Sequence, residues 1–267
     1  ISSQFEEFEF IFTDSETLDI TNKEEVNDFF WQNAPDFCIN AAAYTAVDLA
    51  ETEVEKAFLV NADGTENLAE ACAENNAQFI HVSTDYVFDG ENNLAYTEED
   101  FTNPLGVYGA SKLAGDELAL EVNPCSVILR TSWVYSEFGK NFVKTMLNLF
   151  ATKEELNIVA DQFGQPTNAN DLAEAIMKII KSEKITPGIF NFSNLGRISW
   201  FDFAEKIAEL SDAKIKLNAI ETSQYPTPAK RPKNSVLDLD KISKTYAIQL
   251  KPWEESLEGC VQILQNN

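Results

Sequence analysis

The sequence contains few of the residues that build metal sites, membrane spans and glycine-rich phosphate loops. It has one histidine, and its first glycine is Gly64. The four cysteines lie far apart and lack the spacing of metal ligands, so we predict no metal site and expect buried free thiols in a reducing cytoplasm; they are Cys38, Cys72, Cys125 and Cys260. No apolar run approaches the roughly 18–20 residues of a membrane span, and no signal peptide opens the chain.

Positive charge is also scarce. Twenty Lys and Arg residues stand against 44 Asp and Glu residues, which gives a formal net charge of −24. This balance argues against nucleic acid or an anionic membrane as a partner. It does not exclude a small anionic substrate, because a local basic cluster can hold a diphosphate. The clearest such cluster joins Lys230, Arg231 and Lys233 in a Pro-rich loop, although such a trio is often only a solvated surface.

Strand-like and helix-like segments alternate up to about Trp133, a pattern typical of βαβ units and a parallel sheet. We therefore predict an α/β fold, a Rossmann-like doubly wound parallel sheet with a smaller C-terminal substrate-binding lobe. The expected strands are residues 9–13, 36–40, 79–84 and 125–131. The expected helices are residues 21–32, 51–75, 108–121, 141–152, 171–181, 201–210 and 254–264.

The clearest chemical signal joins a strand end to a helix. The strand-like run from Phe79 ends at Thr84, and Tyr108-Gly-Ala-Ser-Lys112 follows 24 residues later. Tyr and Lys four apart share one helix face, and a neighbouring cation lowers the pKa of a phenol, which is ordinarily about 10. Tyr108 could then donate a proton to a carbonyl, and Thr84 could hydrogen-bond the same oxygen. The pattern suggests carbonyl reduction by hydride from a nicotinamide cofactor, although a bare Tyr-x-x-x-Lys is often a solvated surface pair.

Further segments carry a resemblance to a known family. Residues 40–48, 83–90 and 104–112 resemble the extended short-chain dehydrogenase/reductases. Residues 130–135, 161–167 and 226–235 narrow the resemblance to the dTDP-4-dehydrorhamnose reductases. The similarity runs from about Phe10 to Trp253, and the motifs follow the family's order.

The resemblance implies reduction of the C4 ketone of dTDP-4-dehydro-L-rhamnose to dTDP-L-rhamnose by hydride from NADPH or NADH. Such a reaction belongs to nucleotide-sugar and cell-surface polysaccharide biosynthesis. Tyr108 would protonate the nascent alkoxide, Lys112 would lower its pKa and hold the nicotinamide ribose, and Thr84 would polarise the ketone. We assign no catalytic role to His81, because a lone strand histidine is usually a packing residue.

The resemblance also implies binding residues. Besides Tyr108 and Lys112, those for the cofactor would be Asp14 at the adenosine ribose, Asp19 and Ile20 at the adenine, and Ala41, Ala42 and Ala43 along the ribose and pyrophosphate. Those for the sugar nucleotide would be Thr84, Asp85, Trp133, Gln162, Thr167, Arg231 and Asn234. Structural alternatives stay open. Asp14 can be a turn aspartate, the alanines a packing turn, Asp85 a turn cap and Trp133 a core residue.

One family element has no counterpart here. The family opens on a strand, a Gly-x-x-Gly-x-x-Gly turn and a helix, whereas residues 1–8 read as the tail of that helix. We therefore expect residues 1–150 to form an N-terminally incomplete NAD(P)-binding domain. Residues 151–267 would form most of a discontinuous substrate lobe, with strands returning to the first domain.

Without the glycine turn, the chain as printed is expected to bind NAD(P)H poorly, and it can even be an inactive fragment. The alternatives for function are a reductase or epimerase of another nucleotide-linked 4-keto sugar, and a non-catalytic regulatory member of the fold. A homodimer is a possible assembly.

Overall fold

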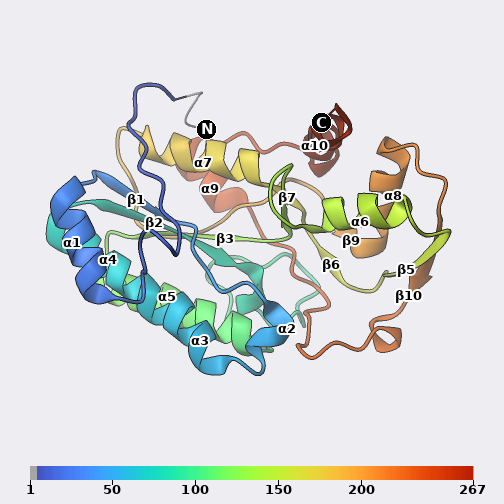
Figure 1. Cartoon of the computed structure of the whole chain (residues 1–267), viewed down its shortest axis with the longest axis horizontal. Coiled ribbons are helices and arrows are strands. Elements are labelled where there is room, and N and C mark those ends of the chain that lie inside the picture. Colours follow the sequence, from blue (N-terminus) through green and yellow to red (C-terminus); the bar gives the residue numbers. More distant parts are fainter. Residues whose placement is uncertain (1–4, 267) are drawn as a thin grey trace.

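The computed structural model describes residues 5–266, and a four-stranded parallel sheet lies at its centre (Figure 1). The strand order is β1-β2-β3-β8, with β1 at Phe37–Asn40, β2 at Gln78–Thr84, β3 at Val127–Thr131 and β8 at Gly188–Asn191. Every residue of β3 is buried, as expected for a central strand of a sheet that is covered on both faces. The predicted α/β fold with a parallel sheet is confirmed.

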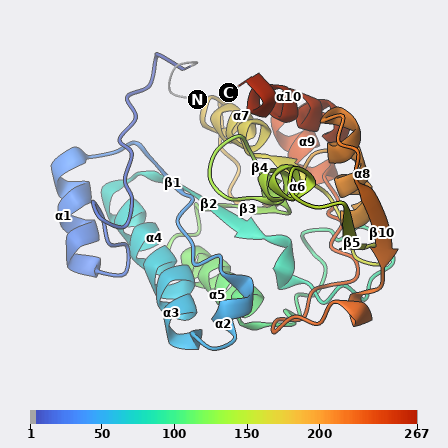
Figure 2. The same cartoon turned by 45° about the vertical axis from the view of Figure 1, so that its right-hand side comes forward.

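Helices cover the two faces of this sheet (Figures 1 and 2). On one face pack α1 (Lys23–Asn33), α4 (Gly64–Asn75) and α5 (Val107–Val122), over Phe79 and Ile128. On the other pack α7 (Ala169–Ile180) and α9 (Asp240–Tyr246), over Ile80 and Leu129. Adjacent strand residues point to opposite faces, so the apolar runs in β2 and β3 supply both cores.

The second lobe contains three two-stranded sheets and three helices around its own core. Its strands are β4 (Val134–Tyr135), β5 (Glu155–Val159), β6 (Phe163–Gly164), β7 (Thr167–Asn168), β9 (Ile198–Ser199) and β10 (Lys216–Ile220), and its helices are α6 (Phe142–Phe150), α8 (Trp200–Leu210) and α10 (Trp253–Asn266). Phe203 and Leu257 are fully buried at the centre of this core. Figure 2 shows this lobe beside the ends of β2 and β3.

Between β1 and α4 the chain forms α2 (Val47–Ala50), α3 (Val54–Phe58) and a π-helical turn, η2 (Leu59–Asp63). The turn η2 carries Asn61, which is buried. Its amide accepts from Tyr44 N–H at 2.8 Å and donates to Ser111 Oγ at 2.9 Å. Asn61 therefore ties the loop after β1 to the helix that carries Tyr108 and Lys112.

Gly115 allows α5 to lie directly on η2. A Cβ atom at Gly115 would lie 2.1 Å from the carbonyl oxygen of Asn61, which is backbone and cannot swing aside. We expect Gly115→Ala to lower the free energy of unfolding by about 1–3 kcal/mol through overpacking. Gly259→Ala is the matched control, because Gly259 is exposed within α10 and a Cβ there meets nothing within 4 Å. It should raise the free energy of unfolding by up to about 1 kcal/mol. Urea unfolding of both variants measures the difference, and equal midpoints would contradict it.

Most expected elements are present, with five corrections. Residues 5–8 form a turn rather than the tail of a helix, and residues 1–4 of that expected tail lie outside the described residues. Residues 9–13 form no strand, because no other described strand pairs with them. The helix predicted from Thr21 begins at Lys23 and is capped by Asn22, which accepts hydrogen bonds from two backbone N–H groups. The sequence did not predict α2, α9 or β8, the edge strand of the central sheet. Cys125 is exposed in the turn before β3, and Cys38 is only half-buried, so only two of the four free thiols are buried.

Within residues 5–266, none of the helices has the length and apolar character needed to cross a bilayer.

Candidate active site

The carboxyl end of β2 delivers the first residues of the site. Thr84 ends the strand and caps the short helix η3 (Asp85–Val87), since its Oγ1 accepts from Tyr86 N–H at 3.2 Å. The same hydroxyl donates to Asp85 Oδ1 at 3.1 Å. The two hydrogen bonds hold the Thr84 hydroxyl beside Asp85 at the end of the strand.

Tyr108 lies in the first turn of α5, beside this strand end. Its ring packs edge-on against that of Tyr86, with 5.6 Å between the centroids. Burial raises the pKa of Tyr108 to about 12, and hydrogen bonding with Thr84 only partly opposes the shift. Burial therefore dominates the pKa of Tyr108 in this structure, and the lowering by Lys112 stays a prediction.

Lys112 is directed into the protein interior. It is 1% exposed, and its Nζ donates to Val82 O at 2.8 Å and lies 3.0 Å from His81 Nε2. Burial lowers the pKa of Lys112 to about 8 and keeps the pKa of His81 well below its ordinary value. Lys112 is therefore close to losing its charge near neutral pH.

Asp116 and Arg130 form a buried ion pair behind this lysine. Arg130 Nε donates to Asp116 Oδ2 at 3.2 Å, and both side chains are almost completely buried. The second oxygen, Asp116 Oδ1, has no hydrogen-bond partner among the described residues and lies 3.8 Å from His81 Nε2. This ion pair therefore links β3 to α5 in the protein interior.

Asp85 is a buried carboxyl, 1% exposed, whose Oδ2 has no partner among the described residues. Burial raises the pKa of Asp85 to about 7. The folded state therefore binds the proton more tightly than the unfolded state, where the pKa is about 3.9. This contribution to stability is complete below the unfolded pKa, and it is lost as the pH rises towards 7.

We accordingly expect Asp85→Asn, which cannot ionise, to stabilise the protein at neutral pH by on the order of 1–4 kcal/mol. The gain over the unsubstituted protein should grow between about pH 5 and pH 8. Urea midpoints at the two pH values measure it. A gain that is the same at both pH values would show that ionisation of Asp85 is not its source.

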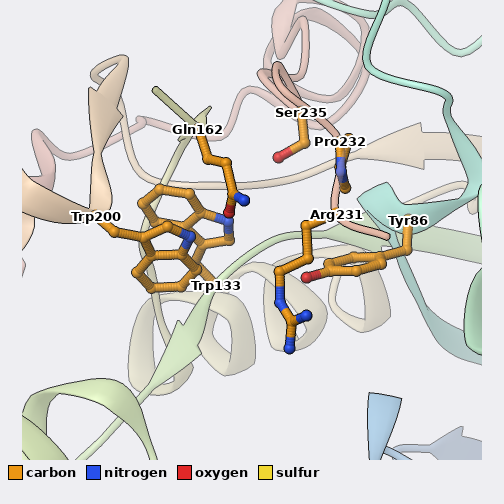
Figure 3. A pocket seen from close by; sticks show the side chains of 7 residues that line it. All are labelled: Tyr86, Trp133, Gln162, Trp200, Arg231, Pro232 and Ser235. Carbon is orange, nitrogen blue, oxygen red and sulfur yellow. The ribbon is translucent and has the colours of Figure 1, made fainter. Parts of the chain in front are cut away.

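A pocket lies between η3, the second lobe and the Pro-rich loop (Figure 3). Its lining residues are Tyr86, Trp133, Gln162, Trp200, Arg231, Pro232 and Ser235. Trp133 and Trp200 are stacked with 3.5 Å between the ring centroids, and Trp133 has a left-handed backbone with φ of 47°. A Cβ at Gly164 would lie 2.6 Å from the Trp133 ring, so only glycine fits beneath it. The pocket therefore has an aromatic wall that is held by unusual backbone geometry.

Arg231 faces this pocket opposite the aromatic wall, beside the ring of Tyr86 (Figure 3). Its Nη1 and Nη2 donate to the two carboxylate oxygens of Asp48 at 3.1 and 2.8 Å, and Nη1 also donates to Ala229 O. These bonds use three of the five guanidinium N–H donors, so two are left for a ligand. Lys230 and Lys233 are exposed on the same loop. Of the basic cluster, only Arg231 lines the pocket.

The other residues predicted to contact the sugar nucleotide lie in different environments. Gln162 lines the pocket and donates to Thr222 Oγ1 at 3.0 Å. Thr167 is fully buried, and its hydroxyl accepts a hydrogen bond from Thr131 and donates one to Ser193. Asn234 is also buried, and its Nδ2 donates to the carbonyl oxygens of residues 92 and 94. Gln162 thus lies at the pocket, whereas the side chains of Thr167 and Asn234 form hydrogen bonds that hold loops in place.

The predicted cofactor residues outside α5 are mostly at the surface. Ala41 and Ala42 are exposed and Ala43 is half-buried in the loop after β1, so their small side chains leave the backbone accessible. Asp14 accepts from Thr17 Oγ1 at 2.9 Å within a turn.

The two residues predicted at the adenine have local contacts as well. Asp19 accepts from the Thr21 hydroxyl at 2.7 Å. Ile20 packs over Gly64, at 2.8 Å from where a Cβ of that glycine would lie. Asp19 therefore has a turn contact like that of Asp14, whereas Ile20 packs over the start of α4.

Sequence reasoning missed several residues of the site. Asp48 lay within a motif, but nothing in the pattern paired it with Arg231. Ser235 ends the motif at residues 226–235 but was not singled out, and Trp200, just before the helix expected at residues 201–210, carried no signal of its own. Tyr86 could have been found, because it follows Thr84 and Asp85 directly. No three His, Cys, Asp or Glu side chains of residues 5–266 are grouped so as to hold a metal ion.

This fold and site define the class. A Rossmann-like parallel sheet whose strand ends in Thr84, beside a helix that presents Tyr108 and Lys112, is that of an extended short-chain dehydrogenase/reductase. The family profile described as "RmlD substrate binding domain" matches residues 2–266. The chain therefore belongs to the RmlD family of dTDP-4-dehydrorhamnose reductases.

Individual relatives agree with this assignment. The dTDP-4-dehydrorhamnose reductase of Sinorhizobium fredii is 49% identical over 240 residues, 86% of this chain and 81% of the relative. That of Aggregatibacter actinomycetemcomitans is 46% identical, covering 94% and 89%. The crystal structure of a dTDP-4-dehydrorhamnose reductase from Clostridium acetobutylicum superposes with a TM-score of 0.94 at 41% identity, covering 99% of this chain and 94% of that one. The Bacillus anthracis reductase, solved in complex with NADP, gives 0.93 at 38% identity, covering 97% and 91%.

Proposed function

We propose that this chain catalyses reduction of the C4 ketone of dTDP-4-dehydro-L-rhamnose to dTDP-L-rhamnose, in nucleotide-sugar biosynthesis, with Thr84, Tyr108 and Lys112 as its catalytic residues. The observation that carries the proposal is the meeting of Thr84 and Tyr108 at the end of β2, next to a pocket that contains Arg231. Membership of the reductase family supports the substrate and the reaction.

Thr84 and Tyr108 can each act on the oxygen atom of the ketone. The hydroxyl of Thr84 can turn from Asp85 to the ketone oxygen and polarise it. Tyr108, whose pKa of about 12 keeps it protonated, can then donate its proton to the nascent alkoxide. The ammonium form of Lys112 would stabilise the phenolate that remains. NADPH or NADH supplies the hydride when bound.

The described residues fit part of such a dinucleotide. Lys112 and Tyr108 would hold the nicotinamide ribose, and the loop of Ala41, Ala42 and Ala43 would lie along the ribose and pyrophosphate. Asp14, Asp19 and Ile20 would bind the adenosine end. No glycine precedes Gly64, so the described residues offer no glycine-rich turn to the pyrophosphate.

The pocket would hold the sugar nucleotide. Arg231 would bind the diphosphate, the Trp133 ring would cover the sugar, and Gln162 and Asp85 would donate or accept hydrogen bonds. Thr167 and Asn234 would support the loops on which these residues lie. Residues 1–150 would bind the cofactor, and residues 151–267 most of the substrate.

The proposal extends to a cytoplasmic enzyme that assembles as a homodimer and binds neither nucleic acid nor membrane. The net charge of −24 supports the last two points. A reductase or epimerase of another nucleotide-linked 4-keto sugar is the alternative within enzymes, and a non-catalytic regulatory role is the alternative outside them.

Cofactor oxidation with three substrates separates these functions. The full chain is incubated with NADPH or NADH and the 4-keto sugar linked to dTDP, UDP or GDP. Turnover with dTDP-4-dehydro-L-rhamnose at least about tenfold faster than with the other two is expected, a discrimination of about 1.4 kcal/mol. Faster turnover of a UDP- or GDP-linked sugar would assign the enzyme to another substrate. No turnover with any of the three, from a chain that calorimetry shows to bind NADPH, would favour the regulatory role.

A further inference from the structure

Lys112 is held by a row of buried polar groups that runs from β1 through β2 to α5. Its Nζ lies 3.0 Å from His81 Nε2, and His81 Nδ1 lies 3.0 Å from Asn40 Nδ2. Asn40, His81 and Lys112 are each no more than 2% exposed. The β1–β2 ladder pairs Asn40 directly with His81, so the sheet register itself sets this contact.

The orientation of the Asn40 amide is fixed by two independent hydrogen bonds. Its Oδ1 accepts from Ala42 N–H at 3.0 Å, and its Nδ2 donates to Thr65 Oγ1 at 3.3 Å. The hydroxyl proton of Thr65 is committed to Asn61 O at 2.8 Å, so Thr65 can only accept from the amide. The group that faces His81 is therefore the Nδ2 amide nitrogen, a donor, and His81 Nδ1 must accept.

This contact selects one tautomer of His81. The ring is neutral, because burial holds its pKa well below the ordinary value. With Nδ1 as acceptor, the single ring proton is on Nε2, which faces Lys112 Nζ. An ammonium has only donors and would oppose this N–H, whereas an uncharged amine has a lone pair that accepts it. The amine can still donate to Val82 O at 2.8 Å.

The ionisable groups nearest Lys112 do not fully offset the effect of burial on its ammonium form. Asp116 on α5 raises the pKa of Lys112, but burial has the larger effect and lowers it. The carboxylate of Asp116 is shared with Arg130 on β3, which offsets its charge. Tyr108, with a pKa of about 12, is uncharged, and Asp85 on η3 has a pKa of about 7.

The residues of η2 and α4 that contact α5 near Lys112 carry no charge. Asn61 on η2 and Thr65 on α4, which contact α5 near Ser111 and Gly115, are both uncharged.

We propose that Asn40 and His81 are positioning residues that destabilise the ammonium form of Lys112, and so favour its uncharged amine, in the arrangement shown by the structure. The consequence for catalysis rests on the proposed function. To stabilise the Tyr108 phenolate, Lys112 must leave His81 Nε2 and take a proton from solvent to become the ammonium. The ammonium form of Lys112 is therefore favoured more strongly once the lysine has left the imidazole N–H.

Nitrogen NMR on histidine-labelled full chain tests the tautomer directly, because His81 is the only histidine. Without substrate or cofactor, we expect a protonated Nε2, an unprotonated Nδ1 and no titration of the ring around its ordinary pKa of about 6.5. A proton on Nδ1, or an imidazolium at neutral pH, would overturn the proposal.

A second measurement follows Lys112 itself through the chemical shift of its Cε, assigned by its loss in Lys112→Arg. The midpoint should be near 8 in the unsubstituted protein. In His81→Gln, the side-chain carbonyl can accept from an ammonium, so the midpoint should rise by at least about one unit. Ser126→Ala is the matched control, because Ser126 is as buried as His81 but its hydroxyl donates to Ala119 O and not to Lys112.

An unchanged midpoint in His81→Gln, or an equal shift in Ser126→Ala, would refute the positioning role. If His81→Gln fails to fold, the ring-nitrogen spectrum of the unsubstituted protein still decides. These spectra require no turnover, so their failure is distinct from failure of the proposed reaction.

Discussion

Tyr108→Phe is expected to lower kcat by roughly 10²–10⁴, the usual contribution of a general acid. The substitution removes only the phenolic oxygen, and the ring keeps its edge-on contact with Tyr86. Substrate and cofactor affinity should therefore survive. The measurement is steady-state oxidation of NADPH with the dTDP-linked 4-keto sugar, together with binding of both ligands by calorimetry.

Tyr135→Phe is the matched control for this loss. Tyr135 is buried in the core of the second lobe, and its hydroxyl has no hydrogen-bond partner among the described residues. It should keep kcat within about twofold, since a surface or core change without catalytic contact leaves the transition state unaltered. A Tyr108→Phe variant that retained most of its kcat would remove Tyr108 from the mechanism.

Arg231→Ala should raise KM for the sugar nucleotide by about one to two orders of magnitude, with cofactor affinity unchanged. The two guanidinium N–H donors that Asp48 and Ala229 leave free can bind phosphate oxygens, and each charge-assisted bond is worth about 1.5–3 kcal/mol. Part of this energy is offset by the carboxylate of Asp48, which remains beside the site. Arg231→Lys should recover only part of the loss, because an ammonium lacks the planar fork.

Lys230→Ala separates this contact from a general loss of positive charge. Lys230 is exposed, is adjacent in sequence and carries the same charge, but it does not line the pocket. Its substitution should change KM by less than about twofold, since exposed charges are screened by salt. An equal effect of the two alanine variants would mean that the loop acts only through its overall charge.

The sequence predicted three of the four strands of the sheet and most helices, because their signals are local. Buried strands such as Val127–Thr131 appear as short apolar runs, and the helix that contains Tyr108 and Lys112 has the spacing of one face. The strand expected at residues 9–13 has the same apolar character. It failed because a strand also needs a partner, and pairing is not a local property.

The candidate site was only half accessible to such reasoning. The residues at the end of β2 and the start of α5 could be named, since each follows from a motif. The protonation states of the site residues could not be predicted from the motifs, because burial decides them. Lys112 and Tyr108 lie on one helix face, yet the lysine turns towards His81 and the phenol keeps its proton. The pairing of Arg231 with Asp48 joins residues that are far apart in the chain and depends on the folded loop.

Isotope transfer tests the central claim most directly. The full chain is incubated with dTDP-4-dehydro-L-rhamnose and NADPH that carries deuterium at both C4 positions of the nicotinamide, and the product is analysed by NMR. The account predicts dTDP-L-rhamnose with one deuterium at C4 of the sugar. A product without deuterium at C4, or with deuterium at another carbon, would contradict hydride transfer to the C4 ketone.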